Sequence, residues 1–367
     1  IFLTSAANIG IVDFQRAVNF RADFIMLLSS KIFSVVVTIA LAFWLRSYWA
    51  LVIGIFSGYL ATFIISYIIH PYRPSLCLEK WREFWGFSKW IIVANLGGFL
   101  NRKTDEILVG KIASPGLLGI YTIALDLGQM VTNELARPIN KVLFPVIANI
   151  QEDLARVKRT YLLTISGINT VTMPVGVGLA LVAEEFVLTI LGEKWLGAVP
   201  FLQIFAIYGV LRFTYSGAAS VLIALGRVKT NSLLTWYEAS FMVGLCLLGG
   251  YYYELTGIAY GRAAASIVMA GITYLYLIKY IQIQLIDIVM VLWRPVISVV
   301  CMALSIQAFH QAFEAVFWVS LICKMLLGAV VYVSVPLFLW NTSGRPDGVE
   351  FMVITRVRKF ISKGKDA

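Results

Sequence analysis

The stretch Leu117–Asn140, LLGIYTIALDLGQMVTNELARPIN, is long and apolar enough to cross a membrane, yet it carries polar residues at regular intervals. A charged side chain at the centre of a bilayer costs about 2.5–3.5 kcal/mol on insertion scales. Spacings of three and four residues place all of these polar side chains on one helical face. That face is expected to line a hydrated cavity or contact a partner helix. Its members are Asp126, Gln129, Asn133, Arg137 and Asn140.

The composition of the whole chain is that of a membrane protein. Hydrophobic residues make up 60% and charged residues 14%, against about 45–50% and 25% in soluble domains. Apolar runs of about twenty residues, enough to cross a hydrocarbon core of about 30 Å, recur along the chain. We therefore predict an all-α, polytopic transmembrane helical bundle. The predicted spans are Phe24–Leu45, Trp49–Ile69, Phe87–Gly110, Leu117–Arg137, Tyr161–Ala183, Val199–Leu225, Leu233–Tyr253, Ile258–Tyr280, Ile288–Phe309 and Val316–Trp340.

The distribution of positive charge predicts the orientation of these spans. Of the 30 lysines and arginines, only Arg46, Lys111 and Lys194 fall in the loops of one side, and most others fall on the opposite side. Loops rich in lysine and arginine are retained in the cytoplasm, so the C-terminal tail, including Arg356–Lys365, is expected to be cytoplasmic. Topology and anionic lipids thus account for the net charge of +10 without a nucleic-acid partner.

The sequence contains no pattern typical of an enzyme, a metal site or a nucleotide-driven pump. The 4 cysteines are scattered, and the 2 histidines, His70 and His310, have no neighbouring ligand in the sequence. HExxH, GxSxG, P-loop and GxGxxG motifs are absent from the sequence. We expect no catalytic residue, no metal and no cofactor.

A second span carries another polar face. Asn95, Gly98, Arg102, Asp105 and Glu106 cluster on one side of the helix that precedes the first. Arg102 has the spacing to pair with Asp105 or Glu106, and Asp126 is a further partner across the two helices. Either these charges form a structural network or they line a hydrated pathway. The uncharged companions Asn95, Gln129, Asn133 and Asn140 exceed what pairing requires, which favours the pathway.

Other charges within the predicted spans give weaker signals. Arg212, Glu238 and Arg262 fall on three consecutive spans, where an ion pair of Glu238 with one arginine is favoured over contact with a substrate. Lys31, Arg294 and Lys324 are close enough to span ends to extend their charged groups toward an interface.

Small and cyclic residues predict how the helices pack. The pairs Gly54 with Gly58 and Gly257 with Gly261 have the spacing that lets helices approach closely. Prolines inside spans, each expected to break or kink its helix, are Pro138, Pro174, Pro295 and Pro336.

Three local motifs resemble the polysaccharide-transporter branch of the multidrug/oligosaccharidyl-lipid/polysaccharide (MOP) flippases, with its Wzx-type O-antigen and exopolysaccharide members. The first motif is DEILVG at 105–110 followed by LGIYTIA at 118–124. The second is RPINKVLFP at 137–145 followed by IQED at 150–153. The third is LGEKW at 191–195 followed by Ala198, Pro200 and LQI at 202–204.

This resemblance implies a MATE-like fold of about fourteen helices in two lobes plus a final pair. The first dozen residues resemble the end of a span closing near Asp13, so the chain, which begins at Ile1, is expected to lack about the first three helices. The implied divisions are the remainder of the N-lobe (1–72), an interlobe linker (73–90), the C-lobe (91–282), the final helix pair (283–341) and a basic cytoplasmic tail (342–367).

The resemblance also implies a function and roles for the polar residues. It implies a flippase of a bacterial inner membrane that moves a polyprenyl-diphosphate-linked oligosaccharide outward by alternating access, within membrane lipids and with H⁺ or Na⁺ as a possible coupling ion. Arg102 and Arg137 would contact the diphosphate, and Asn95, Gln129 and Asn133 the sugar hydroxyls. Asp105, Glu106 and Asp126 would hold the arginines or exchange the coupling ion.

Two alternatives remain open from the sequence. A cation-coupled multidrug exporter of the same superfamily would depend on acidic residues, and the basic balance of the buried charge weighs against it. A membrane glycan polymerase or ligase would need a large extracytoplasmic loop, whereas the predicted outer loops are all short.

Overall fold

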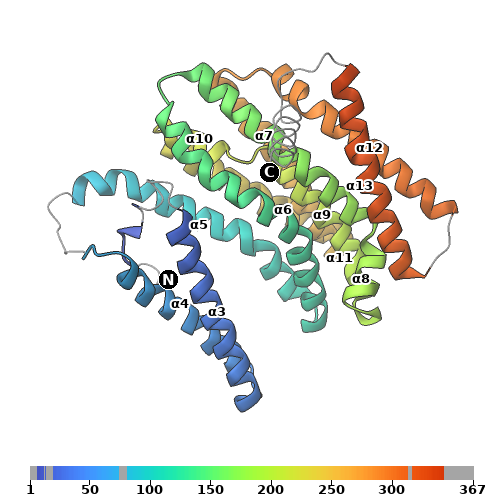
Figure 1. Ribbon diagram of the computed structural model, residues 1–367, viewed down its shortest axis with the longest axis horizontal. Coiled ribbons are helices and arrows are strands. Elements are labelled where there is room, and N and C mark those ends of the chain that lie inside the picture. Colours follow the sequence, from blue (N-terminus) through green and yellow to red (C-terminus); the bar gives the residue numbers. More distant parts are fainter. Residues whose placement is uncertain (1–5, 12, 14–19, 74–80, 313–315, 343–367) are drawn as a thin grey trace, which may run out of the picture. The chain divides into compact units, whose positions relative to one another are not determined.

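The computed structural model describes residues 6–11, 13, 20–73, 81–312 and 316–342 (Figure 1). Of the span end expected near Asp13, residues 1–5 and 12 lie outside these residues, and the basic tail Arg356–Lys365 lies entirely outside them. Every regular element in the described ranges is helical. The elements are α3 (Phe20–Leu45), α4 (Trp49–Ile69), α5 (Trp81–Ile112), α6 (Pro115–Asn149), α7 (Leu154–Leu181), α8 (Ala183–Ile190), η1 (Glu193–Ala198), α9 (Val199–Thr214), α10 (Ala218–Ala224), α11 (Val228–Ile281), α12 (Leu285–Ala312) and α13 (Phe317–Thr342).

The predicted all-helical architecture is confirmed. Each predicted span falls on a helix, but α9 and α10 share one predicted span and α11 contains two. Helix α11 changes direction at Tyr253 and Glu254, where the backbone leaves helical geometry and Glu254 adopts φ 52°. The reversal contains no proline. By contrast, α6, α7, α12 and α13 continue past their internal prolines.

The two arms of α11 pack against each other as the glycine spacing predicts. A Cβ atom at Gly257 would lie 1.9 Å from the carbonyl oxygen of Gly249, and one at Gly261 would lie 2.3 Å from that of Leu245. Because no side chain fits there, the two arms approach at backbone distance. The hairpin therefore places the two arms side by side in the turns next to the reversal.

The chain divides into two compact units, residues 1–84 and 85–367. In the first unit, α3 and α4 form a hairpin that is packed through Gly54 and Gly58, as predicted. A Cβ atom at Gly54 would meet the side chain of Thr38, and one at Gly58 would meet that of Ser34. The Ser34 hydroxyl also donates a hydrogen bond of 2.7 Å to the carbonyl oxygen of Gly54.

The core of the second unit is built around α6, α9 and α11. Helix α6 begins where Ser114 caps it and Pro115 occupies the first turn. One turn further on, Tyr121 is fully buried and packs edge-on against Phe201 and Phe205, with ring centroids 5.4 Å and 5.0 Å away. These contacts fix the inner face of α6 against α9.

Seven segments among the described residues are long and apolar enough to cross a membrane, and α5 and α6 are not among them. These two helices have 32 and 35 residues, so length is not what excludes them. Their charged and amide side chains lower the hydropathy. The chain is thus an integral membrane protein, and α5 and α6, which are not among these segments, are the helices that carry the predicted polar faces.

Candidate functional site

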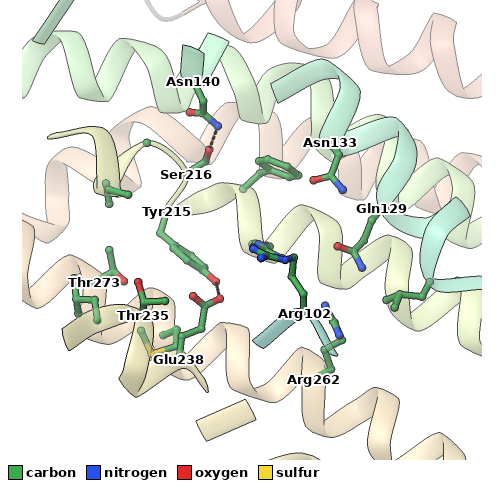
Figure 2. Close-up of a pocket in the computed structure, with 18 of the residues that line it drawn as sticks. Arg102, Gln129, Asn133, Asn140, Tyr215, Ser216, Thr235, Glu238, Arg262 and Thr273 are labelled. Atoms are coloured by element: carbon green, nitrogen blue, oxygen red, sulfur yellow. Dashed lines mark hydrogen bonds between the residues drawn. The ribbon is translucent and has the colours of Figure 1, made fainter. Parts of the chain in front are cut away.

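A cavity of about 810 Å³ lies within the second unit, between α5, α6, the break from α9 to α10, and α11 (Figure 2). Polar side chains from all of these elements line it. The polar lining consists of Arg102, Lys103, Glu106, Asp126, Gln129, Asn133, Glu134, Asn140, Arg212, Tyr215, Ser216, Asn231, Thr235, Glu238, Arg262 and Thr273.

Most of the residues singled out in the sequence come together at this cavity, including all three from the later spans. Two of the described residues, Asn95 and Asp105, do not line it. Asn95 is exposed two turns before Arg102 on α5, and Asp105 is buried behind the wall. Arg137 belongs to α6, but its side chain lies outside the described part of the chain.

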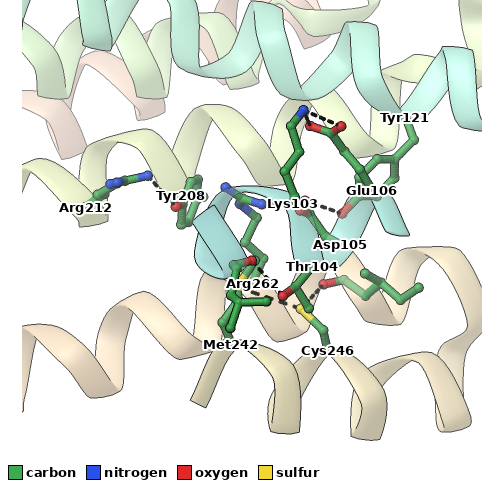
Figure 3. Close-up of polar contacts among 12 residues, drawn as sticks. Lys103, Thr104, Asp105, Glu106, Tyr121, Tyr208, Arg212, Met242, Cys246 and Arg262 are labelled. Atoms are coloured by element: carbon green, nitrogen blue, oxygen red, sulfur yellow. Dashed lines mark hydrogen bonds and ion pairs between the residues drawn. The ribbon is translucent and has the colours of Figure 1, made fainter. Parts of the chain in front are cut away.

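A buried ion pair stands behind the cavity wall. Asp105 Oδ2 lies 2.5 Å from Arg262 Nη1, with side-chain exposures of 0% and 2%. The hydroxyl of Tyr121 donates a hydrogen bond of 3.1 Å to the same carboxylate oxygen (Figure 3). The pair therefore joins α5, α6 and α11. Removing one member of such a pair leaves an uncompensated buried charge.

The ion pairs that the sequence left open for Arg102 are not formed among the described residues. Asp105 pairs with Arg262, and Glu106 pairs with Lys103 at 2.6 Å instead of with Arg102. Asp126 also forms no ion pair within the described residues.

The ion pair predicted between Glu238 and an arginine is wrong. Its carboxylate accepts a hydrogen bond of 3.4 Å from the Tyr215 hydroxyl, not from an arginine. Arg212 donates to the Tyr208 hydroxyl at 3.1 Å, and the ring of Tyr208 lies 4.8 Å from the guanidinium carbon of Arg262. Tyr208 thus contacts both guanidinium groups, one through its hydroxyl and the other through its ring.

Arg102 presents an exposed guanidinium to the cavity. No acidic side chain in the described residues forms an ion pair with it. One turn earlier, Gly98 leaves space for this group, because a Cβ atom there would lie only 3.4 Å from Arg102 Nη1. The cavity therefore contains a cation that the described protein residues do not neutralise.

Amide and hydroxyl groups line the same cavity. Gln129 and Asn133 are on the α6 side of the cavity, toward Arg102 (Figure 2). Further along α6, Asn140 Nδ2 donates a hydrogen bond of 2.6 Å to the hydroxyl of Ser216. Such groups both donate and accept hydrogen bonds, as sugar hydroxyls require.

The charge of the lining is more balanced than the sequence suggested. Arg102, Lys103, Arg212 and Arg262 face as many carboxylates. Among the described lining residues, basic and acidic side chains are therefore equal in number. The carboxylates are those of Glu106, Asp126, Glu134 and Glu238.

Comparison with known proteins identifies the family. The sequence pattern described as "Polysaccharide biosynthesis protein" matches residues 1–200, which is more than half of the chain. The chain belongs to the polysaccharide biosynthesis protein family. The resemblance drawn from the three motifs to the Wzx-type branch of the MOP flippases is thereby confirmed.

Several curated proteins are similar to this polysaccharide biosynthesis protein. Lipopolysaccharide biosynthesis protein WzxC of Escherichia coli (strain K12) is 25% identical over 240 residues, covering 63% of this chain and 49% of the relative. Teichuronic acid biosynthesis protein TuaB of Bacillus subtilis (strain 168) is 29% identical over 212 residues, covering 50% and 44%. Succinoglycan biosynthesis transport protein ExoT of Rhizobium meliloti (strain 1021) is 21% identical over 337 residues, covering 86% and 65%.

The chain spans about half the length of the first two relatives. All three names describe proteins of polysaccharide biosynthesis or transport, which agrees with the expectation of a transporter and not an enzyme. Among solved structures, the Lipid II flippase MurJ in an inward closed conformation aligns with a TM-score of 0.63 and 14% identity, covering 86% of this chain and 68% of that chain. This likeness confirms the MOP fold.

The structure of this family member also contains a polar cluster that the sequence did not predict. Lys324 was expected to extend to an interface, but its side chain is 3% exposed and forms an ion pair with Glu185 of α8. Its ammonium lies 3.0 Å from His310 Nδ1 of α12. The prediction that Lys324 extends toward an interface is wrong, because Glu185, which is distant in sequence, pairs with its charge inside the protein.

Tyr215 and Ser216 are further lining residues that the sequence did not single out. They lie where α9 ends and Gly217, with φ 82°, precedes α10. The apolar run Val199–Leu225 has the pattern of one continuous span. Only Gly217 indicates the break between α9 and α10 that brings these two side chains to the cavity.

Proposed function

We propose that this polysaccharide biosynthesis protein is a flippase, which moves a polyprenyl-diphosphate-linked oligosaccharide from the cytoplasmic to the outer leaflet for surface polysaccharide synthesis. The observation that carries the proposal is the exposed Arg102 guanidinium in a polar cavity of about 810 Å³. A guanidinium offers two parallel donors to phosphate oxygens. The surrounding amides are suited to sugar hydroxyls.

Alternating access requires no covalent chemistry from these side chains. The cavity would accept the diphosphate and glycan from one side while the polyprenyl chain stays in the bilayer, and would then open to the other side. Arg137, Gln129 and Asn133 remain assigned from the sequence to the diphosphate and the sugars. Asn95, which does not line this cavity, would contact the glycan only in another conformation.

The carboxylates have separate roles in this proposal. Asp105 and Glu106 hold Arg262 and Lys103, so neither is available to an exchanging ion in this conformation. Asp126 is exposed in the cavity without an ion-pair partner among the described residues. We assign the exchange of a coupling H⁺ or Na⁺ to Asp126.

The surroundings of the protein are proposed on the same basis. The charge distribution and the family support a bacterial inner membrane with the C-terminus in the cytoplasm. The divisions at 1–72, 73–90, 91–282, 283–341 and 342–367 remain those drawn from the family resemblance.

Asp126 and Glu238 are also the observation that favours the second candidate, a cation-coupled multidrug exporter. An organic cation would bind these carboxylates, and Arg102 would then repel it. The two candidates therefore differ in the sign of the substrate charge, and in which residue is essential.

The test begins with deletion of the full-length gene. A membrane-impermeant glycan label with mass spectrometry then reports which leaflet holds the lipid-linked oligosaccharide. The flippase proposal predicts unlabelled glycolipid accumulating on the cytoplasmic side. Reintroducing the wild-type gene should abolish this accumulation, and reintroducing the Arg102→Gln gene should not. Lys111→Gln, on the same helix but away from the cavity, is the matched control and should behave as wild type.

Two other results would contradict the proposal. Sensitivity to cationic drugs without glycolipid accumulation would support the exporter. Accumulation on the outer face would place the missing step after translocation.

A further inference from the structure

A second group of cations and aromatic rings lies at the open end of the α11 hairpin. We name it the mouth patch. It combines the first turn of α11 with its last turns and with the N-terminal part of α5. Its members are Lys89, Trp90, Arg227, Lys229, Tyr276, Lys279 and Tyr280.

Two aromatic rings organise the cations of the mouth patch. The ammonium of Lys229 lies 5.4 Å from the centre of the Trp90 ring, and that of Lys89 lies 5.8 Å from it. The guanidinium of Arg227 lies 5.2 Å from the Tyr280 ring, and the Lys279 ammonium 5.9 Å from it. Each ring therefore has two cations against it.

The two halves of the patch are joined by α11. The hydroxyls of Thr230 and Tyr280 lie 3.1 Å apart, so the beginning and the end of the hairpin meet here. The Tyr276 ring stacks on that of Tyr280 at 6.4 Å with an interplanar angle of 22°. The patch thus combines basic groups and aromatic rings from α5 and from both ends of α11.

Carboxylates of the described residues do not neutralise the charge of this surface. Lys89, Arg227, Lys229 and Lys279 are all exposed, and none forms an ion pair with a carboxylate of the described residues. Cation–π contacts at exposed sites contribute only about 0.5–1 kcal/mol each. They position the cations but do not cancel their mutual repulsion. An anion of appropriate size would do so.

The mouth patch lies on the same helices as the cavity. Asn231 and Thr235, which line the cavity, follow Lys229 within two turns of α11. The indole nitrogen of Trp236 donates a hydrogen bond of 3.0 Å to the carbonyl oxygen of Val93 and so fixes α11 to α5. The charge distribution predicts that this end of the hairpin is cytoplasmic.

We propose that the mouth patch binds the diphosphate–sugar headgroup of the lipid-linked substrate before the headgroup reaches Arg102. This inference rests on the proposed function and adds a second binding site to it. The cations would contact phosphate oxygens. The faces of Trp90 and Tyr280 would pack against sugar rings, whose C–H faces are apolar. The lipid chain would stay in the adjacent leaflet.

Phosphate on an ordinary anionic phospholipid has the same charge chemistry, so the test separates the two sources. Full-length protein in phosphatidylcholine nanodiscs is titrated with farnesyl diphosphate, a short polyprenyl diphosphate. Parallel titrations use inorganic pyrophosphate, and nanodiscs that contain phosphatidylglycerol provide the competing phospholipid. The proposal predicts binding of both diphosphates that phosphatidylglycerol does not abolish.

Arg227→Gln combined with Lys229→Gln should weaken farnesyl diphosphate binding about tenfold, since each cation near a membrane surface contributes to anion binding. Lys194→Gln is the matched control, because its ammonium lies 5.9 Å from the Trp195 ring in a similar contact elsewhere in the chain. It should bind as wild type does. Trp90→Phe, which keeps every charge, should weaken sugar-bearing substrate more than pyrophosphate.

The outcomes separate this inference from the proposed function. Wild-type affinity in the double variant, with binding lost in Arg102→Gln, would overturn the mouth patch and leave the flippase intact. Full displacement by phosphatidylglycerol would make the patch a general lipid site and overturn the substrate assignment. If the wild-type protein binds neither diphosphate, the proposed function itself fails.

Discussion

Two charged groups three residues apart on α5 have opposite surroundings. Asp105 is fully buried and pairs with Arg262, whereas Arg102 is exposed in the cavity without an ion-pair partner in the described residues. Both are unusual within a membrane protein. The comparison teaches that a charge on a polar helix face either joins helices or remains available to a ligand. Its pairing, and not its presence, decides which.

The largest effect on stability is expected where the buried pair is broken. Asp105→Asn leaves the Arg262 guanidinium buried without a counter-charge, which costs about 3–5 kcal/mol in such pairs. Thermal unfolding in detergent should show a strongly lowered Tm or loss of the folded protein. Replacing both members, Asp105→Leu with Arg262→Met, should recover much of the stability. An unchanged Tm in Asp105→Asn would mean that the pair does not join the helices.

A second buried cation extends the comparison to α13. Lys324→Met removes the ion pair with Glu185, and a charged hydrogen bond of this kind contributes about 1.5–3 kcal/mol. Glu185 retains 12% side-chain exposure, so the loss should be smaller than for Asp105→Asn. Unfolding measurements on the two variants side by side should give this order. A larger loss in Lys324→Met than in Asp105→Asn would contradict the claim that the more deeply buried pair contributes more.

The same pair predicts a dependence on pH. Burial raises the pKa of Glu185, but its hydrogen bond with Lys324 outweighs this, and the net pKa is lowered. The stabilisation is therefore present above the unfolded carboxyl pKa of about 4.3 and is lost as the pH falls through the lowered folded value. Tm measured from neutral to acid pH should fall in wild type more steeply than in Lys324→Met. Parallel curves of Tm against pH for the two proteins would contradict the assignment of this pH dependence to the Glu185–Lys324 pair.

A smaller effect is expected for a neutral pair at the cavity. Asn140→Ala removes the hydrogen bond to Ser216, which contributes about 1 kcal/mol. Ser216→Ala, which removes the other member, should cost a similar amount, and the double variant should cost little more than either. Additive losses would show that the two side chains act independently.

The polar faces of α5 and α6 could be predicted from sequence because they depend on local spacing alone. The pairing of Asp105 with Arg262 could not, since several cations had suitable spacing and the choice depends on how α11 packs against α5. For the same reason the sequence missed Glu185 as the partner of Lys324. Tertiary packing selects among partners that the sequence leaves equivalent.

The helix pattern shows the same division between local and distant information. Each predicted span lies on a helix because hydrophobic length is a local property. The reversal at Tyr253 and Glu254 falls at the end of the predicted span Leu233–Tyr253, but the break at Gly217 does not interrupt the apolar run. The Tyr215 and Ser216 side chains therefore became visible as cavity lining only in the folded chain. The division into lobes, linker and final pair stays a prediction from the family resemblance.

The most direct test of the central claim compares Arg102→Gln with Asp105→Asn in the full-length protein, measuring both Tm and glycolipid export. Arg102→Gln should change the stability by no more than about 0.5 kcal/mol, as is usual for exposed sites, and should nevertheless abolish export. Asp105→Asn should lose export together with stability. Wild-type export by a stable Arg102→Gln protein would contradict the claim that the exposed guanidinium binds the substrate diphosphate.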